Sequence, residues 1–215
     1  MLVRERMTRN PVLCSPDLPV NDAFDLIKKE RIRRMPVVDK GGKLVGIVSD
    51  KDLLRVTPSP ATTLSAYEIP YLLSKVKVGD VMTKQVITVI EDTPIEDAAR
   101  IMVDNRIGGL PVIHETGAVV GIITETDIFK TFLELLGARK PGVRITMYVK
   151  DRRGELARMA KAVADVGGNI VATVEMPGTD STNYEVLLKV TEASKDALVD
   201  ALKPIVERIV DVREG

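Results

Sequence analysis

The sequence Val45-Gly46-Ile47-Val48-Ser49-Asp50-Lys51-Asp52 returns 75 positions later as Val120-Gly121-Ile122-Ile123-Thr124-Glu125-Thr126-Asp127. In both copies an apolar run leads to a hydroxyl residue, and an aspartate follows three positions after it. The apolar run is typical of a short buried strand, and a serine or threonine with an acidic residue three positions later is typical of a helix N-terminus. We therefore predict a strand that leads directly into a helix, and we predict this arrangement twice.

The repeat extends well beyond this stretch. Residues 7–56 align with residues 82–131 without a gap, and roughly 15 of the 50 aligned positions are identical. A duplication at a fixed spacing indicates one structural unit that is present twice. Closely matched pairs include Met7-Thr8 and Met82-Thr83, Pro19-Val20 and Pro94-Ile95, Asp22-Ala23 and Asp97-Ala98, and Met35-Pro36-Val37 and Leu110-Pro111-Val112.

Each copy is predicted to fold in the order β-α-β-β-α. A short extended segment around Val12 or Ile87 comes first, and a proline then opens a helix whose apolar residues recur at helical spacing. Two apolar strands follow, at residues 36–38 and 44–48 of the first copy, joined by a glycine-containing turn. The second helix begins after Ser49. The apolar stripe of the first helix consists of Val20, Ala23, Phe24 and Ile27.

Residues 143–213 predict a different unit, with the order β-α-β-β-α-β of ferredoxin-like folds. Alternating apolar residues mark its strands, and a helix near Ser194–Leu202 precedes the last one. Another helix is predicted to turn Leu156, Met159, Ala160 and Val163 inwards and to end at Gly167-Gly168. The predicted strands cover residues 143–149, 170–176, 184–190 and 209–212.

The chain is thus predicted to be an α+β protein with three folded units. Between the two copies, Ser65 and Glu68 form a capping-box pattern that predicts a helix through about Leu73. The predicted boundaries are 1–57 for the first copy, 58–76 for the connector with its helix, 77–136 for the second copy, 137–142 for a linker and 143–215 for the C-terminal unit.

The composition argues against several classes of function. The 31 basic and 31 acidic residues balance, whereas a general nucleic-acid or acidic-membrane binder carries a basic excess. No apolar run approaches the ~18 residues of a membrane span, and the first residues lack the apolar stretch of a signal peptide. One cysteine cannot form an internal disulfide, and no cysteine–histidine cluster has metal-ligand spacing. We expect a cytoplasmic protein without a metal site.

The repeated strand–hydroxyl–aspartate pattern has two interpretations. In the first, the hydroxyl and the carboxylate simply cap the following helix. In the second, the same geometry binds a nucleotide: free N–H groups at a helix start and the hydroxyl attract phosphate, and the carboxylate accepts both hydroxyls of a ribose. The neighbouring apolar strand would then cover a flat base. The residues alone leave both interpretations open.

The two copies resemble a tandem of cystathionine-β-synthase-type (CBS) domains, together called a Bateman module, over about residues 1–135. The resemblance rests on Val-x-x-x-Met-Thr at residues 3–8 and 78–83, on the Met-Pro-Val or Leu-Pro-Val strand, and on the glycine, two apolar residues, Ser/Thr and Asp of the stretch quoted first. It implies an adenosine-containing ligand, such as AMP, ADP, ATP or S-adenosylmethionine, in clefts between the copies. This ligand would be regulatory, and no cofactor is required.

The resemblance also implies a role for individual residues. Asp52 and Asp127 would accept ribose hydroxyls, while Ser49 and Thr124 would face phosphate. Arg34 matches a family position that contacts phosphate. The base would lie against Val12, Leu13, Cys14, Met35 and Pro36, or against Val86, Ile87, Thr88, Leu110 and Pro111.

The two implied clefts differ in chemistry. The counterpart of Arg34 is Gly109, and Asp50 and Glu125 place negative charge near the expected phosphate. Only the first cleft is therefore expected to hold this cation, which favours it for a phosphorylated ligand.

The C-terminal unit resembles an ACT domain over about residues 143–214. Its marks are Val-Lys-Asp-Arg-Arg-Gly-Glu-Leu at residues 149–156 and Gly-Gly-Asn-Ile at residues 167–170. The resemblance implies either an amino acid bound between subunits or pairing into a homodimer. As structural alternatives, the glycine permits a tight turn and the asparagine follows a helix C-cap. The candidate amino-acid-binding residues are Gly154, Glu155, Leu156, Asn169 and Ile170.

The order CBS, CBS, ACT resembles the acetoin-utilisation-type family of small regulatory proteins, and it implies a sensor that acts on a regulated protein which the sequence does not name. A homodimeric scaffold with vestigial clefts is the alternative. An enzyme is the weakest hypothesis because no catalytic residue emerges: His114, the single histidine, ends a strand, and Cys14 aligns with Val89 and reads as a small buried hydrophobe.

Overall fold

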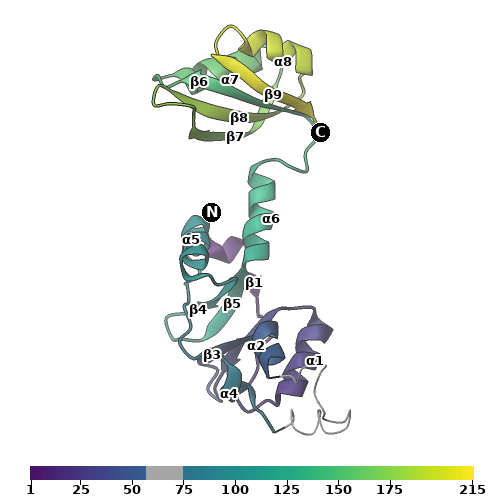
Figure 1. Cartoon of the computed structure of the whole chain (residues 1–215), viewed down its shortest axis with the longest axis vertical. Helices are drawn as coiled ribbons and strands as arrows, with labels where there is room; N and C mark the ends of the chain where they lie inside the picture. Colours follow the sequence, from purple (N-terminus) through teal and green to yellow (C-terminus); the bar gives the residue numbers. More distant parts are fainter. Residues whose placement is uncertain (57–74) are drawn as a thin grey trace. The chain divides into compact units, whose positions relative to one another are not determined.

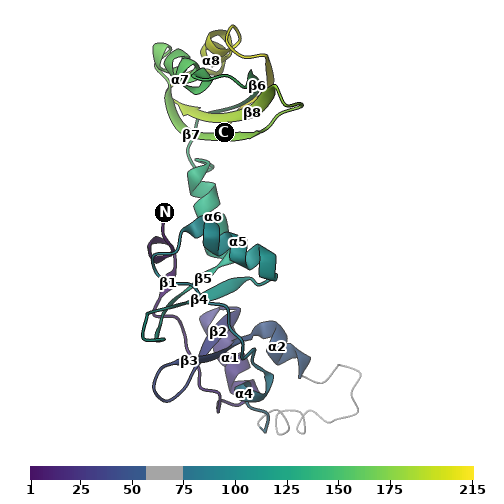
Figure 2. The same ribbon diagram turned by 90° about the vertical axis from the view of Figure 1, so that its left-hand side faces the viewer.

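The computed structural model describes residues 1–56 and 75–215. They form two compact units, Met1–Ile128 and Phe129–Gly215, which are treated separately below (Figures 1 and 2). The first unit contains both repeats. The helix predicted between Ser65 and Leu73 lies outside the described residues.

In each repeat a helix, two strands and a second helix follow in the predicted order, and the first three of these elements have equivalent bounds. The first strand predicted for each repeat is only an isolated bridge, between Cys14 and Val37 or between Val89 and Val112. In each repeat the first helix ends at an arginine with a positive φ, 53° at Arg31 and 54° at Arg106. In the first repeat the elements are α1 (Val20–Glu30), β2 (Arg34–Val38), β3 (Leu44–Ser49) and α2 (Asp50–Arg55). In the second they are α5 (Ile95–Asn105), β4 (Gly109–Ile113), β5 (Val119–Thr124) and α6 (Glu125–Leu135). Each repeat is preceded by short elements: η1 (Val3–Glu5) and β1 (Thr8–Arg9), or α4 (Val78–Val81).

The segments before the two repeats are exchanged between them. Val3 and Met7 are buried in the core of the second repeat, whereas Val78 is buried in the core of the first. Backbone pairing follows the same exchange, because Thr8 pairs with β5 and Thr83 forms two hydrogen bonds with Ile47 of β3, of 2.9 and 3.0 Å. Each repeat is therefore completed by the N-terminal segment of the other.

Two glycines of the repeated stretch make room for this exchange. A Cβ atom on Gly46 would collide with the side chain of Met82, and one on Gly121 would collide with that of Met7. These are the methionines of the two Met-Thr pairs, and each lies across the strand of the opposite repeat. The glycine and the methionine of the sequence pattern are thus two sides of one contact.

A Gly121→Ala substitution is expected to lower the free energy of unfolding by about 1–3 kcal/mol, because the added methyl group overpacks the contact with Met7 and meets the carbonyl oxygen of Thr8 at 3.1 Å. Urea denaturation followed by circular dichroism measures it. Gly41→Ala, in an exposed turn, is the control and should change stability by less than about 0.5 kcal/mol. Equal effects of the two substitutions would show that the contact does not restrict residue 121.

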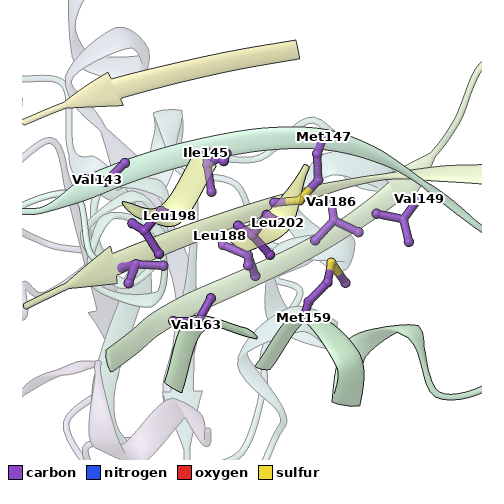
Figure 3. Packing of buried hydrophobic residues seen from close by; sticks show 11 residues of the cluster. Val143, Ile145, Met147, Val149, Met159, Val163, Val186, Leu188, Leu198 and Leu202 are labelled. Atoms are coloured by element: carbon purple, nitrogen blue, oxygen red, sulfur yellow. The ribbon is translucent and has the colours of Figure 1, made fainter. Parts of the chain in front are cut away.

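The C-terminal unit has the predicted β-α-β-β-α-β order. Its elements are β6 (Val143–Lys150), α7 (Glu155–Asp165), β7 (Asn169–Pro177), β8 (Asn183–Thr191), α8 (Lys195–Leu202) and β9 (Arg208–Glu214). The strands form one antiparallel sheet in the order β7-β8-β6-β9. Side chains of β6 and β8 meet those of α7 and α8 in a single apolar core (Figure 3).

Two details of this unit differ from the prediction. The helix α7 turns Glu155, not Leu156, towards the interior: Leu156 is 52% exposed, while Glu155 is 4% exposed and ion-paired with Arg152 and Arg158. The strand β7 also changes face, because its register shifts between Ile170 and Ala172. A shift of one residue reverses the side-chain alternation, so Ile170 packs on the core while the later apolar residues of β7 lie on the opposite face.

The division between the units falls inside α6, earlier than the predicted linker at 137–142. Of the residues in α6, Ile128 packs against the core of the second repeat. Beyond it, Phe129 and Phe132 are 66% and 55% exposed. The helix continues through this division, and Thr131 beyond it is buried.

Within residues 1–56 and 75–215, no helix has the length and apolar character needed to cross a bilayer. The same residues contain no group of three or more His, Cys, Asp or Glu side chains that could hold a metal ion.

Candidate functional site

Two pockets lie between the repeats, at the ends of β3 and β5. The first pocket, of about 540 Å³, contains Ser49 and Asp52 of the first repeat and Val86 and Ile87 of the second. The second pocket, of about 400 Å³, contains Thr124 and Asp127 of the second repeat together with residues of the first. Those residues of the first repeat include Thr8, Asn10, Pro11, Val12 and Ile32.

The segment exchange decides which residues meet. Since Thr83 pairs with β3, the residues that follow it, up to Ile87, are carried to the carboxylate of the first repeat. Since Thr8 pairs with β5, the residues up to Val12 are carried to the carboxylate of the second repeat. Each pocket is therefore built from the aspartate of one repeat and the N-terminal segment of the other.

Each hydroxyl residue is hydrogen-bonded to its aspartate. Ser49 donates to Oδ2 of Asp52 from its backbone N–H at 2.9 Å and from its hydroxyl at 2.6 Å. Thr124 donates to Oδ2 of Asp127 in the same two ways, at 2.9 and 2.7 Å. At Ser49 these contacts form a capping box, because the backbone N–H of Asp52 also donates to the Ser49 hydroxyl at 3.3 Å. In both repeats the hydroxyl donates to a carboxylate. A phosphate would receive a hydrogen bond from either hydroxyl only after that hydroxyl rotates.

The pockets differ in charge. The first pocket contains five basic and three acidic side chains, the second three basic and two acidic. Apolar residues such as Pro11, Val12 and Ile122 line more of the second pocket. The basic residues of the first pocket are Arg33, Arg34, Lys51, Arg55 and Arg106, and those of the second are Arg31, Arg33 and Arg34.

Strand register explains which predicted residues reach the pockets. Arg34 lies opposite Ser49 and Met35 opposite Val48, and successive side chains of a strand point to opposite faces. Arg34 and Ser49 therefore line the first pocket, while Met35 and Val48 are buried in the core. The same register in the second repeat places Thr124 at the second pocket and Leu110 in the core.

The predicted residues thus divide into two groups. Arg34, Ser49, Asp52, Val86 and Ile87 line the first pocket, and Val12, Arg34, Thr124 and Asp127 line the second. The remaining candidates line neither: Leu13, Cys14, Met35, Pro36, Thr88, Leu110 and Pro111. All of these except Leu13 and Thr88 are buried, so their side chains support the pockets from behind.

The expectation that Arg34 belongs to the first cleft alone is wrong. Arg34 lines both pockets, and its guanidinium lies against Gly108 and Gly109 of the second repeat. The glycine that replaces arginine in the second repeat therefore leaves space that the arginine of the first repeat fills.

Other pocket residues were not found from the sequence. Gln85 and Arg106 line the first pocket, and Asn10 and Arg31 line the second. Asn10 and Gln85 are equivalent in the repeat, as are Arg31 and Arg106. The sequence contained a signal for these residues. In both repeats a polar amide residue lies two positions after the Met-Thr pair, and an arginine directly follows the first helix.

The Cys14 thiol is buried in the first core, and this burial raises its pKa to about 11 from an ordinary value of 9.0. A higher pKa lowers the thiolate fraction at pH 8 by about 100-fold, and the thiolate is the reactive form. We expect the native protein to react with a thiol reagent such as Ellman's reagent at least about 100-fold more slowly than the urea-unfolded chain. Similar rates in both states would contradict this burial.

The five candidate residues of the C-terminal unit fall into two separate groups. Gly154, Glu155 and Leu156 follow the end of β6 at Lys150, whereas Asn169 and Ile170 pair with the end of β8 that faces the start of β6. The helix α7 between the groups has 11 residues and is about 16 Å long. A single pocket within one chain therefore does not join them.

Comparisons with known proteins agree with this architecture. The family model described as "CBS domain" matches residues 3–59 and 78–134, together more than half of the chain. Two of the similar solved structures are a complex of CBSX2 with AMP (33% identity, TM-score 0.52, 61% of this chain and 96% of that chain) and the CBS domain pair of MJ0100 with 5′-methylthioadenosine and S-adenosyl-L-methionine (29% identity, TM-score 0.52, 65% and 98%).

A third similar structure is described as a putative acetoin utilization protein (AcuB) from Vibrio cholerae, with 32% identity and a TM-score of 0.53 over 65% of this chain and 96% of that chain. The two matched ranges cover the two repeats found in the sequence. Each range starts at the buried valine of an exchanged segment, Val3 or Val78. On the family match and the paired repeats, this chain belongs to the CBS-domain family.

Proposed function

We propose that this protein is a non-catalytic regulatory sensor that binds adenosine-containing ligands in the two pockets of its CBS pair. The observation that carries the proposal is that Asp52 and Asp127 each line a pocket together with apolar residues of the opposite repeat. Basic side chains line both pockets as well. The complexes of CBSX2 with AMP and of MJ0100 with two adenosine compounds support it, because both proteins are similar to this chain over its repeats.

The chemistry of each pocket suits an adenosine compound. A carboxylate can accept hydrogen bonds from the two neighbouring hydroxyls of a ribose. Oδ1 of Asp52 lies 3.9 Å from a guanidinium nitrogen of the exposed Arg55, which is beyond hydrogen-bond distance, so Arg55 does not form a hydrogen bond with this oxygen. Val86 and Ile87 provide an apolar surface for a base. The arginine and lysine side chains that line the first pocket would bind phosphate.

The charges favour different ligands in the two pockets. The first pocket has more basic side chains, among them Lys51, Arg55 and Arg106, and we assign to it the ligand with more phosphate groups. The second pocket is smaller and more apolar, and we assign to it a nucleoside, a nucleoside monophosphate or a sulfonium compound.

A ligand in either pocket touches both repeats and can therefore report on their arrangement. The ligand shifts the equilibrium between two arrangements of the repeats only by the difference in its affinity for them, however tightly it binds. The C-terminal unit resembles an ACT domain, and we assign to it dimerisation of the chain or binding of an amino acid, with a regulated protein as the downstream partner.

The test is isothermal titration calorimetry of the purified protein with AMP, ADP, ATP and S-adenosylmethionine. At least one compound should bind with a micromolar dissociation constant, which corresponds to about 8 kcal/mol. Inosine monophosphate, which shares the ribose phosphate but not the adenine, is the matched control ligand. A folded protein that gives no heat with any of the adenosine compounds would overturn the proposal.

A second candidate function is a homodimeric scaffold whose pockets are vestigial. It is favoured by the exposed apolar side chains of α6, Phe129, Phe132 and Leu135, which are 66, 55 and 56% exposed. This candidate predicts that Asp52→Ala and Asp127→Ala leave self-association and partner association unchanged. Sedimentation analysis of these variants, with and without AMP, separates it from the sensor.

A further inference from the structure

One arginine stands between the two pockets. Four residues line both of them: Arg33, Arg34, Gly108 and Glu125. These residues form the wall that the pockets share. Arg33 is exposed, whereas Arg34 is partly buried inside the wall. A side chain in this position can contact a ligand on either side.

The second repeat has no equivalent cation, and the structure gives the reason. In the repeat, Gly108 and Gly109 take the places of Arg33 and Arg34. A Cβ atom on Gly108 would lie 2.6 Å from Nη2 of Arg34, and one on Gly109 would collide with its guanidinium and with the carbonyl oxygen of Ile123 at 3.1 Å. The space of a second arginine is therefore occupied by the first, and one guanidinium serves both pockets.

Arg34 is a partly buried cation with two carboxylates, Glu125 and Asp50, close enough to act on it electrostatically. Burial lowers the pKa of its guanidinium, and Glu125 and Asp50 oppose this effect through their negative charges. Glu125 lines both pockets, with Oε2 2.7 Å from the position of a Gly108 Cβ, while Asp50 lines the first pocket only. An arginine remains charged at neutral pH, so a phosphate in either pocket would find a partly desolvated cation in the wall.

We propose that Arg34 is a shared phosphate contact that couples the two pockets negatively: a phosphorylated ligand in one pocket engages its guanidinium and weakens the binding of a phosphorylated ligand in the other. This inference rests on the proposed function, because it requires that both pockets bind adenosine compounds. The second anion meets a cation that is already neutralised, and it meets the charge of the first anion across a thin wall. An uncharged ligand in either pocket escapes both effects.

The coupling is measured by calorimetry with AMP on the wild type and on single-pocket variants, with and without Arg34. Asp127→Ala keeps the first pocket and Asp52→Ala keeps the second, so each reports the intrinsic affinity of one pocket. In the wild type, the second binding step should be about fivefold to tenfold weaker than the intrinsic affinity of the weaker pocket. In Arg34→Gln both steps should weaken, but the second step should equal the intrinsic affinity of the weaker pocket as measured in the double variants Arg34→Gln/Asp127→Ala and Arg34→Gln/Asp52→Ala. The uncharged ligand 5′-methylthioadenosine should show no coupling in any of them.

A second variant keeps the charge and changes only its position. Gly109→Ala displaces the guanidinium, because the atom nearest to the new methyl group is Nη1 at the flexible end of Arg34; the methyl group also lies 3.1 Å from the backbone carbonyl oxygen of Ile123. It should reduce the coupling as Arg34→Gln does, and circular dichroism would verify that it is folded. The matched control is Arg106→Gln, which removes a cation of the first pocket only and should retain the coupling.

Two results would overturn the inference in different ways. Two wild-type binding steps with the intrinsic affinities of the single-pocket variants, or a coupling that persists in Arg34→Gln, would contradict the shared contact and leave the proposed function in place. No binding of AMP or 5′-methylthioadenosine to any folded variant would overturn both.

Discussion

A Val3→Asp substitution is expected to destabilise the second repeat, not the first, by at least about 3 kcal/mol. Val3 is fully buried in the core formed with α5 and β4, and its backbone N–H donates to the carbonyl of Thr93 at 2.9 Å. A carboxylate at this position would lose its hydration without gaining a partner, which is among the most costly changes that a core can receive. The segment exchange determines where this cost appears.

Hydrogen exchange measured by mass spectrometry locates the damage. In Val3→Asp, amides of α5 and β4 should exchange faster than those of α1 and β2. The mirror variant Val78→Asp changes the equivalent buried residue and should reverse this order. Val103→Asp, at a position that is 75% exposed on α5, is the surface control. If Val3→Asp loosened α1 and β2 and spared α5, the exchanged arrangement would be wrong.

The second large effect concerns the two carboxylates. Asp52→Ala is expected to weaken binding of AMP to the first pocket by about 10- to 100-fold, because hydrogen bonds to a charged group contribute about 1.5–3 kcal/mol. Asp127→Ala should have the same effect on the second pocket. Each substitution also removes the acidic partner of the capping hydroxyl residue, whose backbone N–H it accepts, and therefore lowers stability.

A matched variant separates these two consequences. Asp52→Asn keeps an oxygen that accepts from the backbone and hydroxyl of Ser49, so it should preserve most of the stability while it loses the charge that holds ribose hydroxyls. Calorimetry gives the affinity and thermal unfolding gives the stability. If the affinity for AMP followed the stability across Asp52→Ala and Asp52→Asn, the aspartate would act only as a cap.

Local patterns predicted most of the secondary structure. The stripe of Val20, Ala23 and Ile27 is buried on one face of α1 as expected, and Ser194 caps α8. These features depend on helical or strand periodicity and on neighbouring residues, which a sequence displays directly. Leu156 and β7 were predicted less well. The face that α7 buries includes the charged residue Glu155, which pairs with Arg152 and Arg158 three positions away, and the register shift in β7 depends on its pairing with β8.

The candidate site was predicted in its parts but not in its assembly. The aspartates were identified from the repeated sequence, and the resemblance to CBS domains added Arg34 and the segments around Val12 and Val86. Their distribution over the pockets was not, because an apolar residue such as Met7 carries no sign of which of two similar cores it enters. The exchange decides that Asp52 meets Val86 and that Asp127 meets Val12.

By itself, the sequence determined that the chain contains a duplicated β-α-β-β-α unit, a third unit of ferredoxin-like order, and two strand–helix junctions with an aspartate. Those properties follow from periodicity, spacing and turn residues, which act over a few positions. Only the tertiary structure decided that the N-terminal segments are exchanged and that Arg34 lies in a wall common to both pockets. These contacts join residues between 36 positions apart (Gly46 and Met82) and 114 positions apart (Met7 and Gly121), where side-chain packing and not local preference selects the partner.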